Sequence, residues 1–418
     1  DLDFGHRSAH ETRLAELYIV VSAVRQAMRE LRHWMAARRV PTPLKLRPGR
    51  ALVVPQPLGV AGIVSPWNYP VQLALAPAVA ALAAGNRVML KPSELTPATS
   101  ALLAEAIAER FDPGEFTVVT GGATTGAAFA KLPFDHLFFT GSTAVGRLVA
   151  KAAADNLTPV TLELGGKSPV IVAPGADLAQ VAPRLAVGKL LNAGQTCIAP
   201  DYALVPAGDV DAFVDAVRDA VRALYPDPMH GDDYTTIVDA RHFERLVGLT
   251  EDARAKGARV VTVPDGAAPD PRTRRIPPTL VVGADDSMRI MHEEIFGPLL
   301  PVETYASLDD AIAKVTHRPR PLAFYLFGAD RDARARLLRE TVAGGVTIDD
   351  TLWHFAHEGL PFGGVGASGW GAYHGEAGFL TFSHRKSVFV QPRFAATKLF
   401  YPPYGARFET MLSLLKRL

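Results

Sequence analysis

The chain has 418 residues, of which 48% are hydrophobic and 21% are charged. This length predicts two or three structural units, each with its own core. The formal net charge of +1 gives no reason to expect nucleic acid as a partner, and no stretch of roughly 18 uninterrupted apolar residues predicts a membrane span. We therefore expect neither nucleic acid nor a membrane as a partner.

The single cysteine, Cys197, rules out an intramolecular disulfide and fits the reducing cytoplasm, where we expect the protein to reside. Any thiol chemistry must use this residue. The sequence begins at Asp1 and enters helix-like sequence almost at once, so we expect the native N-terminus to lie upstream.

Residues 11–39 carry apolar side chains at helical spacing and basic residues on the other face, which predicts a long amphipathic helix packed on the body. The apolar positions are Leu14, Leu17, Tyr18, Val21, Val24, Met28, Leu31 and Trp34. Prolines then end this helix. Two short apolar segments, 44–47 and 51–54, flank Pro48-Gly49 and predict a β-hairpin.

Strands and helices alternate from residue 59 onward, which predicts right-handed crossovers and a parallel sheet. The expected strands are 60–64, 87–90, 116–119, 136–139 and 160–162, and the expected helices are 71–84, 96–110, 124–131 and 142–154. A second alternation predicts a second α/β unit, with strands at 170–172, 202–205 and 346–348 and helices at 178–193, 210–224, 242–256 and 308–315.

Two further segments stand outside this alternation. Residues 264–278 are rich in Pro, Gly, Asp and Arg and should form an exposed, mobile loop. The tail, residues 407–418, has an apolar stripe that predicts packing on the body or on a partner. Its members are Phe408, Met411, Leu412, Leu415 and Leu418.

Cys197 lies in a polar, turn-prone segment where a helix should end at or near Gly194. A structural cysteine more often sits inside an apolar run, so this position favours a nucleophile, whose reactive form is the thiolate. The alternative is a buried small hydrophobic residue.

Glu163 lies between two leucines at the end of a predicted strand and is followed by Gly165-Gly166. A carboxyl group in a partly apolar site has a raised pKa and can act as a general base. Alternatively, Glu163 faces outward or pairs with Lys167.

Asn68 follows the first predicted strand, at the edge where open α/β sheets bind ligands. Its amide is a candidate donor to an oxyanion, although it could equally cap the next helix. Lys91 and Glu94 follow the second strand and could hold ribose hydroxyls or form a solvated ion pair. Residues 140–146 open a helix with glycine and hydroxyl side chains, a pattern typical of pyrophosphate sites.

Together and in this order, these segments resemble the aldehyde dehydrogenase superfamily over nearly the whole chain. The resemblance is carried by residues 66–68 (PWN), 91–94 (KPSE), 141–146 (GSTAVG), 163–167 (ELGGK), 194–197 (GQTC), 294–298 (EIFGP) and 361–366 (PFGGVG). Residues 198–202 and 368–375 are similar to the class 3 branch. Residues 4–12 look like those of bacterial coniferyl aldehyde dehydrogenases.

The resemblance implies an NAD(P)-dependent enzyme that oxidises an aldehyde to the carboxylic acid. The aldehyde would be aromatic, such as coniferaldehyde, or medium- to long-chain aliphatic. In that reaction Cys197 forms a thiohemiacetal and then a thioester, and Glu163 is the base for hydrolysis. Asn68 and the backbone N–H of Cys197 stabilise the oxyanion.

The resemblance also implies NAD as the cofactor, with NADP as an alternative. The implied cofactor-binding residues are Ser65, Pro66, Trp67, Lys91, Ser93, Glu94, Gly141, Ser142, Gly146, Leu164, Glu294 and Phe296. Among them, Lys91 and Glu94 would hold the adenosine ribose, and Glu294 the nicotinamide ribose. Candidates for the aldehyde pocket, several of which could equally be packing residues, are Tyr69, Trp353, Phe355 and His357.

The implied fold is α/β, with two open parallel-sheet domains and a small β element for bridging and oligomerisation. Residues 1–36 and 57–163 would form a Rossmann-like cofactor-binding domain, and residues 164–370 the catalytic domain. Residues 37–56 and 371–396 would form the bridging element, and residues 397–418 a helical tail. We expect a homodimer, and no metal site, because the twelve histidines lack ligand spacing.

Three alternatives remain open at this point. A CoA-acylating dehydrogenase or an acyl-phosphate semialdehyde dehydrogenase would not need a base, so Glu163 argues against both. A non-catalytic cofactor-binding homologue would not need every catalytic position to be occupied, as it is here.

Overall fold

The structure is a computed structural model that describes residues 1–394, 397–398 and 401–416. Its first unit is a six-stranded sheet in the order β15-β7-β6-β3-β4-β5, parallel except at β15. The strands are β3 (Val60–Val64), β4 (Arg87–Lys91), β5 (Phe116–Val118), β6 (His136–Thr140), β7 (Val160–Glu163) and β15 (Gly369–Trp370). The short apolar strand segments predicted between residues 60 and 162 are therefore confirmed.

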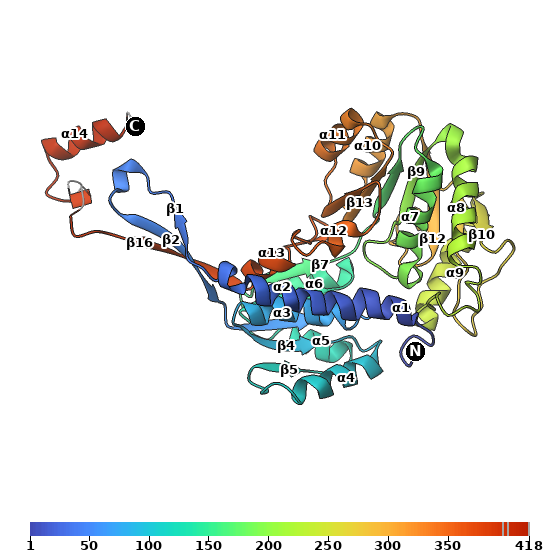
Figure 1. Ribbon diagram of the computed structural model, residues 1–418, viewed down its shortest axis with the longest axis horizontal. Helices are drawn as coiled ribbons and strands as arrows, with labels where there is room; N and C mark the ends of the chain where they lie inside the picture. The colour runs from blue at the N-terminus through green and yellow to red at the C-terminus, as the bar shows by residue number, and fades with distance from the viewer. Residues whose placement is uncertain (395–396, 399–400, 417–418) are drawn as a thin grey trace.

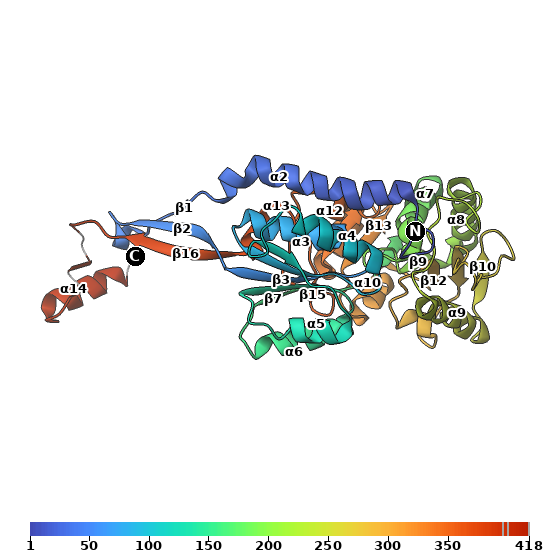
Figure 2. The same ribbon diagram turned by 90° about the horizontal axis from the view of Figure 1, so that it is seen from below.

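Helices cover both faces of this sheet (Figure 2). One face carries α3 (Gln72–Ala83) and α4 (Pro97–Ala108), and the other carries α5 (Ala123–Phe129) and α6 (Thr143–Ala154). Helix α4 begins with Pro97, whose missing N–H has no intrahelical partner to lose. Helix α3 ends before Gly85, which takes a left-handed φ of 83°.

The second unit is a seven-stranded sheet in the order β10-β11-β12-β9-β8-β13-β14, parallel except at β10. Its strands are β8 (Pro169–Val172), β9 (Tyr202–Pro206), β10 (Arg259–Thr262), β11 (Thr279–Val282), β12 (Leu299–Tyr305), β13 (Ala323–Phe327) and β14 (Gly345–Ile348). Its helices are α7 (Leu178–Leu190), α8 (Val210–Leu224), α9 (Ala240–Ala255), α10 (Leu308–His317) and α11 (Arg331–Glu340). The two parallel-sheet units confirm the predicted fold class.

A three-stranded antiparallel arm extends away from these units (Figure 1). It consists of β1 (Arg38–Val40), β2 (Arg50–Pro57) and β16 (Ser383–Val390), and α14 (Ala406–Leu415) lies at its far end. One strand of the predicted hairpin is confirmed, because residues 51–54 lie within β2. The other strand is wrong, because β2 pairs with residues 38–40 and not with residues 44–47. Residues 44–46 form a 3-10 turn inside a longer loop, bounded by prolines that cannot donate to a strand ladder.

The N-terminal helix runs through α1 (Ala9–Glu11), a π-helical segment η1 (Thr12–Tyr18) and α2 (Ile19–Trp34). Its predicted packing face is wrong, because most of the apolar stripe points to solvent. The inward face instead carries Glu16, Ala27 and Trp34. The exposed members are Leu14, Leu17, Tyr18, Val21, Val24 and Met28.

Glu16 explains which face of this helix turns inward. Its carboxylate pairs with Arg7 at 3.1 Å and accepts the backbone N–H groups of Val71 and Gln72 at 2.7 and 3.1 Å. These donors open α3, which has no side-chain cap from its own N-terminal residue. A buried carboxylate is stable only with such partners, so this contact fixes the rotation of the helix against apolar preference.

The predicted loop and the predicted tail agree with expectation only in part. The predicted loop 264–278 is exposed in its first half, but residues 275–278 are buried and lead into β11. The Tyr234 hydroxyl, itself buried, donates to the carbonyl of Ile276 and holds this end down. In the tail, α14 confirms a helix, while Leu418 lies outside the described residues.

Among the described residues, every helix is too short or too polar to span a membrane.

The remaining α-helices are α12 (Trp353–Ala356) and α13 (Gly375–Thr381). The strands of the two parallel-sheet units fall inside the ranges expected for each unit, apart from β15, which comes late in the chain and joins the first sheet. The domain boundaries themselves stay a prediction.

Candidate active site

Residues from both sheet units line one pocket of about 240 Å³. From the first unit come segments that follow the carboxyl ends of β3, β6 and β7, where parallel α/β sheets bind ligands. The second unit contributes Cys197 and residues of α9 and of the loop before β12. The lining residues are Pro66, Trp67, Asn68, Leu73, Thr140, Gly141, Ser142, Glu163, Leu164, Gly165, Cys197, His242, Arg245, Glu294 and Phe296.

The segment before Cys197 is a buried left-handed turn. Helix α7 ends at Leu190, earlier than the predicted residue 193, and Asn192, Ala193 and Gly194 follow with φ values of 53°, 51° and 74°. Left-handed backbone costs a non-glycine residue about 1–2 kcal/mol, so the surroundings must hold it in place. At Gly194 a Cβ would lie 2.3 Å from the carbonyl oxygen of Gly297, which excludes any side chain.

Side-chain amides hold this turn against Asn68. The Asn192 Nδ2 group donates to the carbonyls of Asn68 and Gln195, at 3.0 and 3.2 Å. The Asn68 Nδ2 group donates to the same Gln195 carbonyl at 3.1 Å. An amide NH₂ carries two donors, so this bond leaves Asn68 a second N–H for a ligand.

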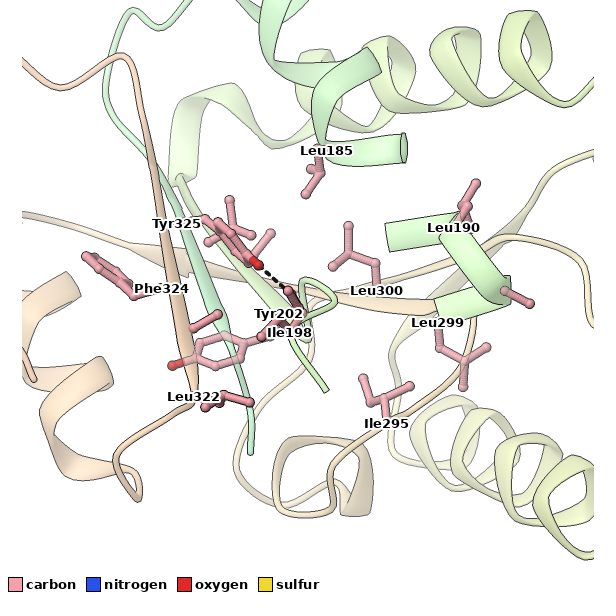
Figure 3. Packing of buried hydrophobic residues seen from close by; sticks show 14 of the residues in the cluster. Leu185, Leu190, Ile198, Tyr202, Ile295, Leu299, Leu300, Leu322, Phe324 and Tyr325 are labelled. Carbon is pink, nitrogen blue, oxygen red and sulfur yellow. Dashed lines mark hydrogen bonds between the residues drawn. The ribbon is translucent and has the colours of Figure 1, made fainter. Parts of the chain in front are cut away.

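The residues on either side of Cys197 are anchored from opposite directions. Thr196 shares a 2.8 Å hydrogen bond with the Tyr69 hydroxyl. The Tyr325 hydroxyl donates to the carbonyl of Ile198, within an apolar core formed by α7, β9 and β13 (Figure 3). The half-buried thiol of Cys197 therefore lies between two residues, Thr196 and Ile198, that are both hydrogen-bonded to buried tyrosines.

The Cys197 thiol and Glu163 lie in a low-dielectric environment. Burial raises the pKa of the thiol, and the nearby Glu163 and Glu294 carboxyl groups raise it further. Burial likewise raises the pKa of Glu163 well above its ordinary value, against a bond from the Gly364 backbone that lowers it. Glu163 Oε1 has no hydrogen-bond partner in the described part of the chain, so one oxygen remains free for a ligand.

The expected alternative for Glu163, an ion pair with Lys167, is wrong. Lys167 pairs instead with Asp201, and its ammonium also donates to the carbonyls of Ile290 and Glu293, at 2.7 and 3.0 Å. Lys167 thus fastens the segment that carries Glu294. Asp201 also accepts the backbone N–H of Ile295, at 2.9 Å.

Glu294 extends into the pocket over Gly165-Gly166, the glycine pair that follows β7. A Cβ on Gly165 would lie 2.1 Å from Glu294 Oε1, so glycine is needed for this approach. Burial, with the charge of Asp201 as the next cause, raises the pKa of Glu294 to about 7. The Arg245 guanidinium donates to the carbonyls of Glu294 and Ile295 and closes that side.

The residues expected to hold a dinucleotide fall into two groups. Around the pocket, the buried atoms Ser65 Oγ, Thr140 Oγ1 and Glu294 Oε1 have no partner within the described chain, as expected of groups that await a polar ligand. The Ser142 hydroxyl accepts the N–H of Val145 and caps α6, so the positive N-terminal end of that helix lies at the pocket. These features fit a cofactor that carries phosphates and hydroxyl groups.

The second group lies at the end of β4. Lys91 and Glu94 form an ion pair of 2.8 Å, with Lys91 buried and the Glu94 side chain 43% exposed. Partial burial opposes ionisation of Glu94, but the bonds from Lys91 prevail and leave its pKa lowered. Beside this pair, the Ser93 hydroxyl accepts the N–H of Leu95, and the Ser93 carbonyl accepts the Ser100 hydroxyl. Gly146 lets Leu164 pack against α6, because a Cβ at Gly146 would lie 2.6 Å from a Leu164 methyl group.

The structure thus brings many of the predicted site residues together and leaves others apart. The pocket contains the three catalytic candidates and seven cofactor candidates, namely Pro66, Trp67, Gly141, Ser142, Leu164, Glu294 and Phe296. Tyr69 is buried just behind Thr196 and does not line the pocket. Trp353 is 63% exposed, His357 is also exposed, and Phe355 packs on Phe362 and His374, so none of these three lines the pocket.

Sequence reasoning missed His242 and Arg245, which also line the pocket. His242 meets the Trp67 ring edge to face at 5.1 Å, and its Nδ1 contacts Asp239 at 2.8 Å. It is one of twelve histidines and lies on an ordinary-looking amphipathic helix, so no local pattern marks it. Only the packing of α9 against the first unit reveals its place.

Comparison with known proteins agrees with this geometry. The sequence profile of the Aldehyde dehydrogenase family matches residues 5–388. A protein of Pseudomonas aeruginosa, described as a probable coniferyl aldehyde dehydrogenase, is 50% identical over 412 residues, which cover 99% of this chain and 86% of that protein. The chain therefore belongs to the aldehyde dehydrogenase family.

Solved structures show the same fold. The substrate-bound Staphylococcus aureus AldH is 41% identical, with a TM-score of 0.93 over 98% of this chain and 88% of that one. A Mycobacterium tuberculosis aldehyde dehydrogenase complexed with NAD+ is 33% identical, with a TM-score of 0.77 over 88% of this chain and 76% of that one. The protein is an NAD(P)-dependent enzyme that oxidises a small-molecule aldehyde to the carboxylic acid.

The raised pKa of the thiol predicts how Cys197 reacts in the enzyme without cofactor. The thiolate should be a small fraction at neutral pH, so alkylation by iodoacetamide should accelerate about tenfold per pH unit from pH 7 to 9, without a plateau. Mass spectrometry of quenched samples measures the rate, with free N-acetylcysteine as the reference thiol. A plateau below pH 8 would mean that the thiol is already ionised and that burial does not control it.

Proposed function

We propose that Cys197, Asn68 and Glu163 carry out the oxidation of the aldehyde. The observation that supports this assignment is their convergence on one pocket from three separate parts of the chain. The Cys197 thiolate attacks the carbonyl carbon, and a C–S bond forms while the C=O π electrons move to oxygen. The free N–H of Asn68 and the backbone N–H of Cys197 stabilise that oxyanion.

When bound, NAD(P)+ would supply the hydride acceptor for the former carbonyl carbon. Cys197 then carries the acyl group as a thioester. Glu163 accepts a proton from water, whose oxygen attacks the thioester carbonyl, and the C–S bond breaks to release the acid and the thiolate. Its raised pKa makes Glu163 a strong proton acceptor once it has released its own proton.

The pocket and the cluster at the end of β4 together support the assignment of the cofactor residues. Glu294 and Phe296 would hold the nicotinamide ribose and ring, Gly141 and Ser142 the phosphates, and Lys91 with Glu94 the adenosine ribose. The remaining members of the proposed set are Ser65, Pro66, Trp67, Ser93, Gly146 and Leu164. The Glu94 carboxylate would repel a 2′-phosphate, so we propose NAD in preference to NADP.

We propose an aromatic aldehyde of the coniferaldehyde type as the substrate, with longer aliphatic aldehydes as the second choice. The half-identical relative described as a probable coniferyl aldehyde dehydrogenase supports this choice. Tyr69 would act through Thr196 rather than by contact with the substrate. Trp353 and Phe355 have no part in this proposal, because neither lines the pocket.

We also propose that the enzyme is a homodimer in the cytoplasm. β16 is an edge strand of the projecting arm, and a row of unpaired backbone groups at an edge favours pairing with another chain. Apolar side chains at its end, Phe389 and Val390, are more than two-fifths exposed. Sedimentation equilibrium at micromolar concentration should give the mass of a dimer, and a monomer would contradict this part.

NADH formation, followed by absorbance with coniferaldehyde, benzaldehyde, hexanal and decanal, tests the reaction and its substrate class. We expect coniferaldehyde to give the highest kcat/KM, and NAD to exceed NADP. Cys197→Ser should lose at least about a thousandfold in kcat, because an alcohol is a far weaker nucleophile than a thiolate. A parallel assay with added CoA separates hydrolysis from CoA acylation.

Two outcomes of these assays would contradict the proposal. Activity that survives in Cys197→Ser would remove the thiol from the mechanism, because the chain has no other cysteine. Product that forms only in the presence of CoA would contradict the role of Glu163 as the base for hydrolysis.

A further inference from the structure

The N-terminal segment binds three different elements through three carboxylates. Asp3 accepts the backbone N–H groups of Ala98 and Thr99, at 2.8 and 2.9 Å, and so caps α4. Glu16 caps α3 in the same way. Glu11, between them, binds no helix terminus. It reaches instead into the turn that precedes Cys197.

Glu11 meets this turn at its first left-handed residue. Glu11 Oε2 accepts the backbone N–H of Asn192 at 3.0 Å and the Thr235 hydroxyl at 3.1 Å. Asn192 is fully buried, so its N–H has no access to water. Without the carboxylate this donor would be left unpaired in the very conformation that already costs free energy.

Asn192 passes this constraint on to both sides of the reaction pocket. Its side-chain amide holds the carbonyls of Asn68 and Gln195, and its own carbonyl accepts the N–H of Gln195 at 3.0 Å. The Gln195 side chain is in turn bonded to the backbone of Thr236 and Val238. The orientation of Asn192 therefore sets the separation between the Asn68 backbone and the segment that carries Cys197.

The surroundings of Glu11 show that its carboxyl group is not a solvated surface charge. Burial raises the pKa of Glu11 to about 7, while the bonds from Asn192 and Thr235 and the charge of Arg7 lower it. Asp233 is the acidic group that faces it, and the hydroxyls of Tyr69, Tyr225 and Tyr234 also lie within its influence. A carboxyl group placed here costs free energy that its two hydrogen bonds offset.

We propose that Glu11 is a positioning residue for the reaction, which acts through the Asn192 N–H to hold the left-handed turn that presents Cys197 beside Asn68. Glu11 does not line the pocket and touches neither the thiol nor Asn68. The proposal rests on the proposed role of Cys197 as the nucleophile.

The test compares Glu11→Ala and Glu11→Gln with Asp3→Ala, a control that removes a similarly bonded carboxylate from the same segment. We expect Glu11→Ala to lower kcat about tenfold, the order expected when one buried donor loses its acceptor. Alkylation of Cys197 by iodoacetamide should instead accelerate about tenfold, because a turn that is no longer held exposes the thiol to water and removes the burial that opposes its ionisation. KM for the aldehyde should stay within about twofold. Glu11→Gln keeps an acceptor oxygen and should stay within about twofold of the wild type in both rates.

The control separates positioning from general destabilisation. Asp3→Ala should lower the thermal midpoint, as loss of a helix cap does, but leave the alkylation rate unchanged. An alkylation rate in Glu11→Ala within twofold of the wild type would overturn the proposal. An equal change of the alkylation rate in Asp3→Ala would overturn it as well.

Glu11→Met, which keeps the side-chain volume without an acceptor, replaces Glu11→Ala if the latter does not fold. Failure of both to fold, with Glu11→Gln folded, would overturn the proposal, because Glu11 would then serve the whole fold. Failure of the underlying mechanism is distinguishable, since it would appear as turnover retained in Cys197→Ser, whereas the alkylation rate needs neither cofactor nor aldehyde.

Discussion

The structure depends on one backbone constraint, the left-handed turn at residues 192–194 that ends α7 inside the core. Had the helix continued, Cys197 would lie on its buried face, and Asn68 would have no chain segment to bind. The turn costs conformational free energy at Asn192 and Ala193. Hydrogen bonds from the Asn192 and Gln195 amides offset that cost and at the same time place the thiol against the first unit.

The second constraint is electrostatic and follows from the first. Once the turn brings Cys197 into the pocket, three acidic groups, Cys197, Glu163 and Glu294, share one poorly solvated space. Burial raises the pKa of each, and the two carboxyl groups add to the shift of the thiol. Groups coupled in this way titrate together, so the ionisation of one opposes that of the next.

Much of the framework could be predicted from the sequence because burial leaves a simple pattern. Short apolar strands between residues 60 and 163 are covered on both faces, and no competing signal disturbs them. The three catalytic candidates could be recognised because each is a polar residue at or just after the end of a buried strand or a helix. They are Cys197, Glu163 and Asn68. Their convergence follows from the topology, which places those ends at one pocket.

The failures have a physical cause in each case. The predicted inward face of the N-terminal helix was wrong because the hydrogen bonds of one buried carboxylate, that of Glu16, outweigh the burial of a long apolar stripe. The hairpin register was wrong because prolines around residues 41–48 removed the donors that a strand needs. Lys167 and His242 depend on long-range partners, Asp201 and Trp67, which no local spacing reveals.

The most direct test of the account is to trap the acyl group on the thiol. A Glu163→Gln variant mixed with coniferaldehyde and NAD, quenched in acid and digested, should carry on the Cys197 peptide an adduct whose mass equals that of the aldehyde minus two hydrogens. The wild-type enzyme should show much less of it, because hydrolysis removes the acyl group. NADH formed in a single turnover without any adduct on Cys197 would contradict the account.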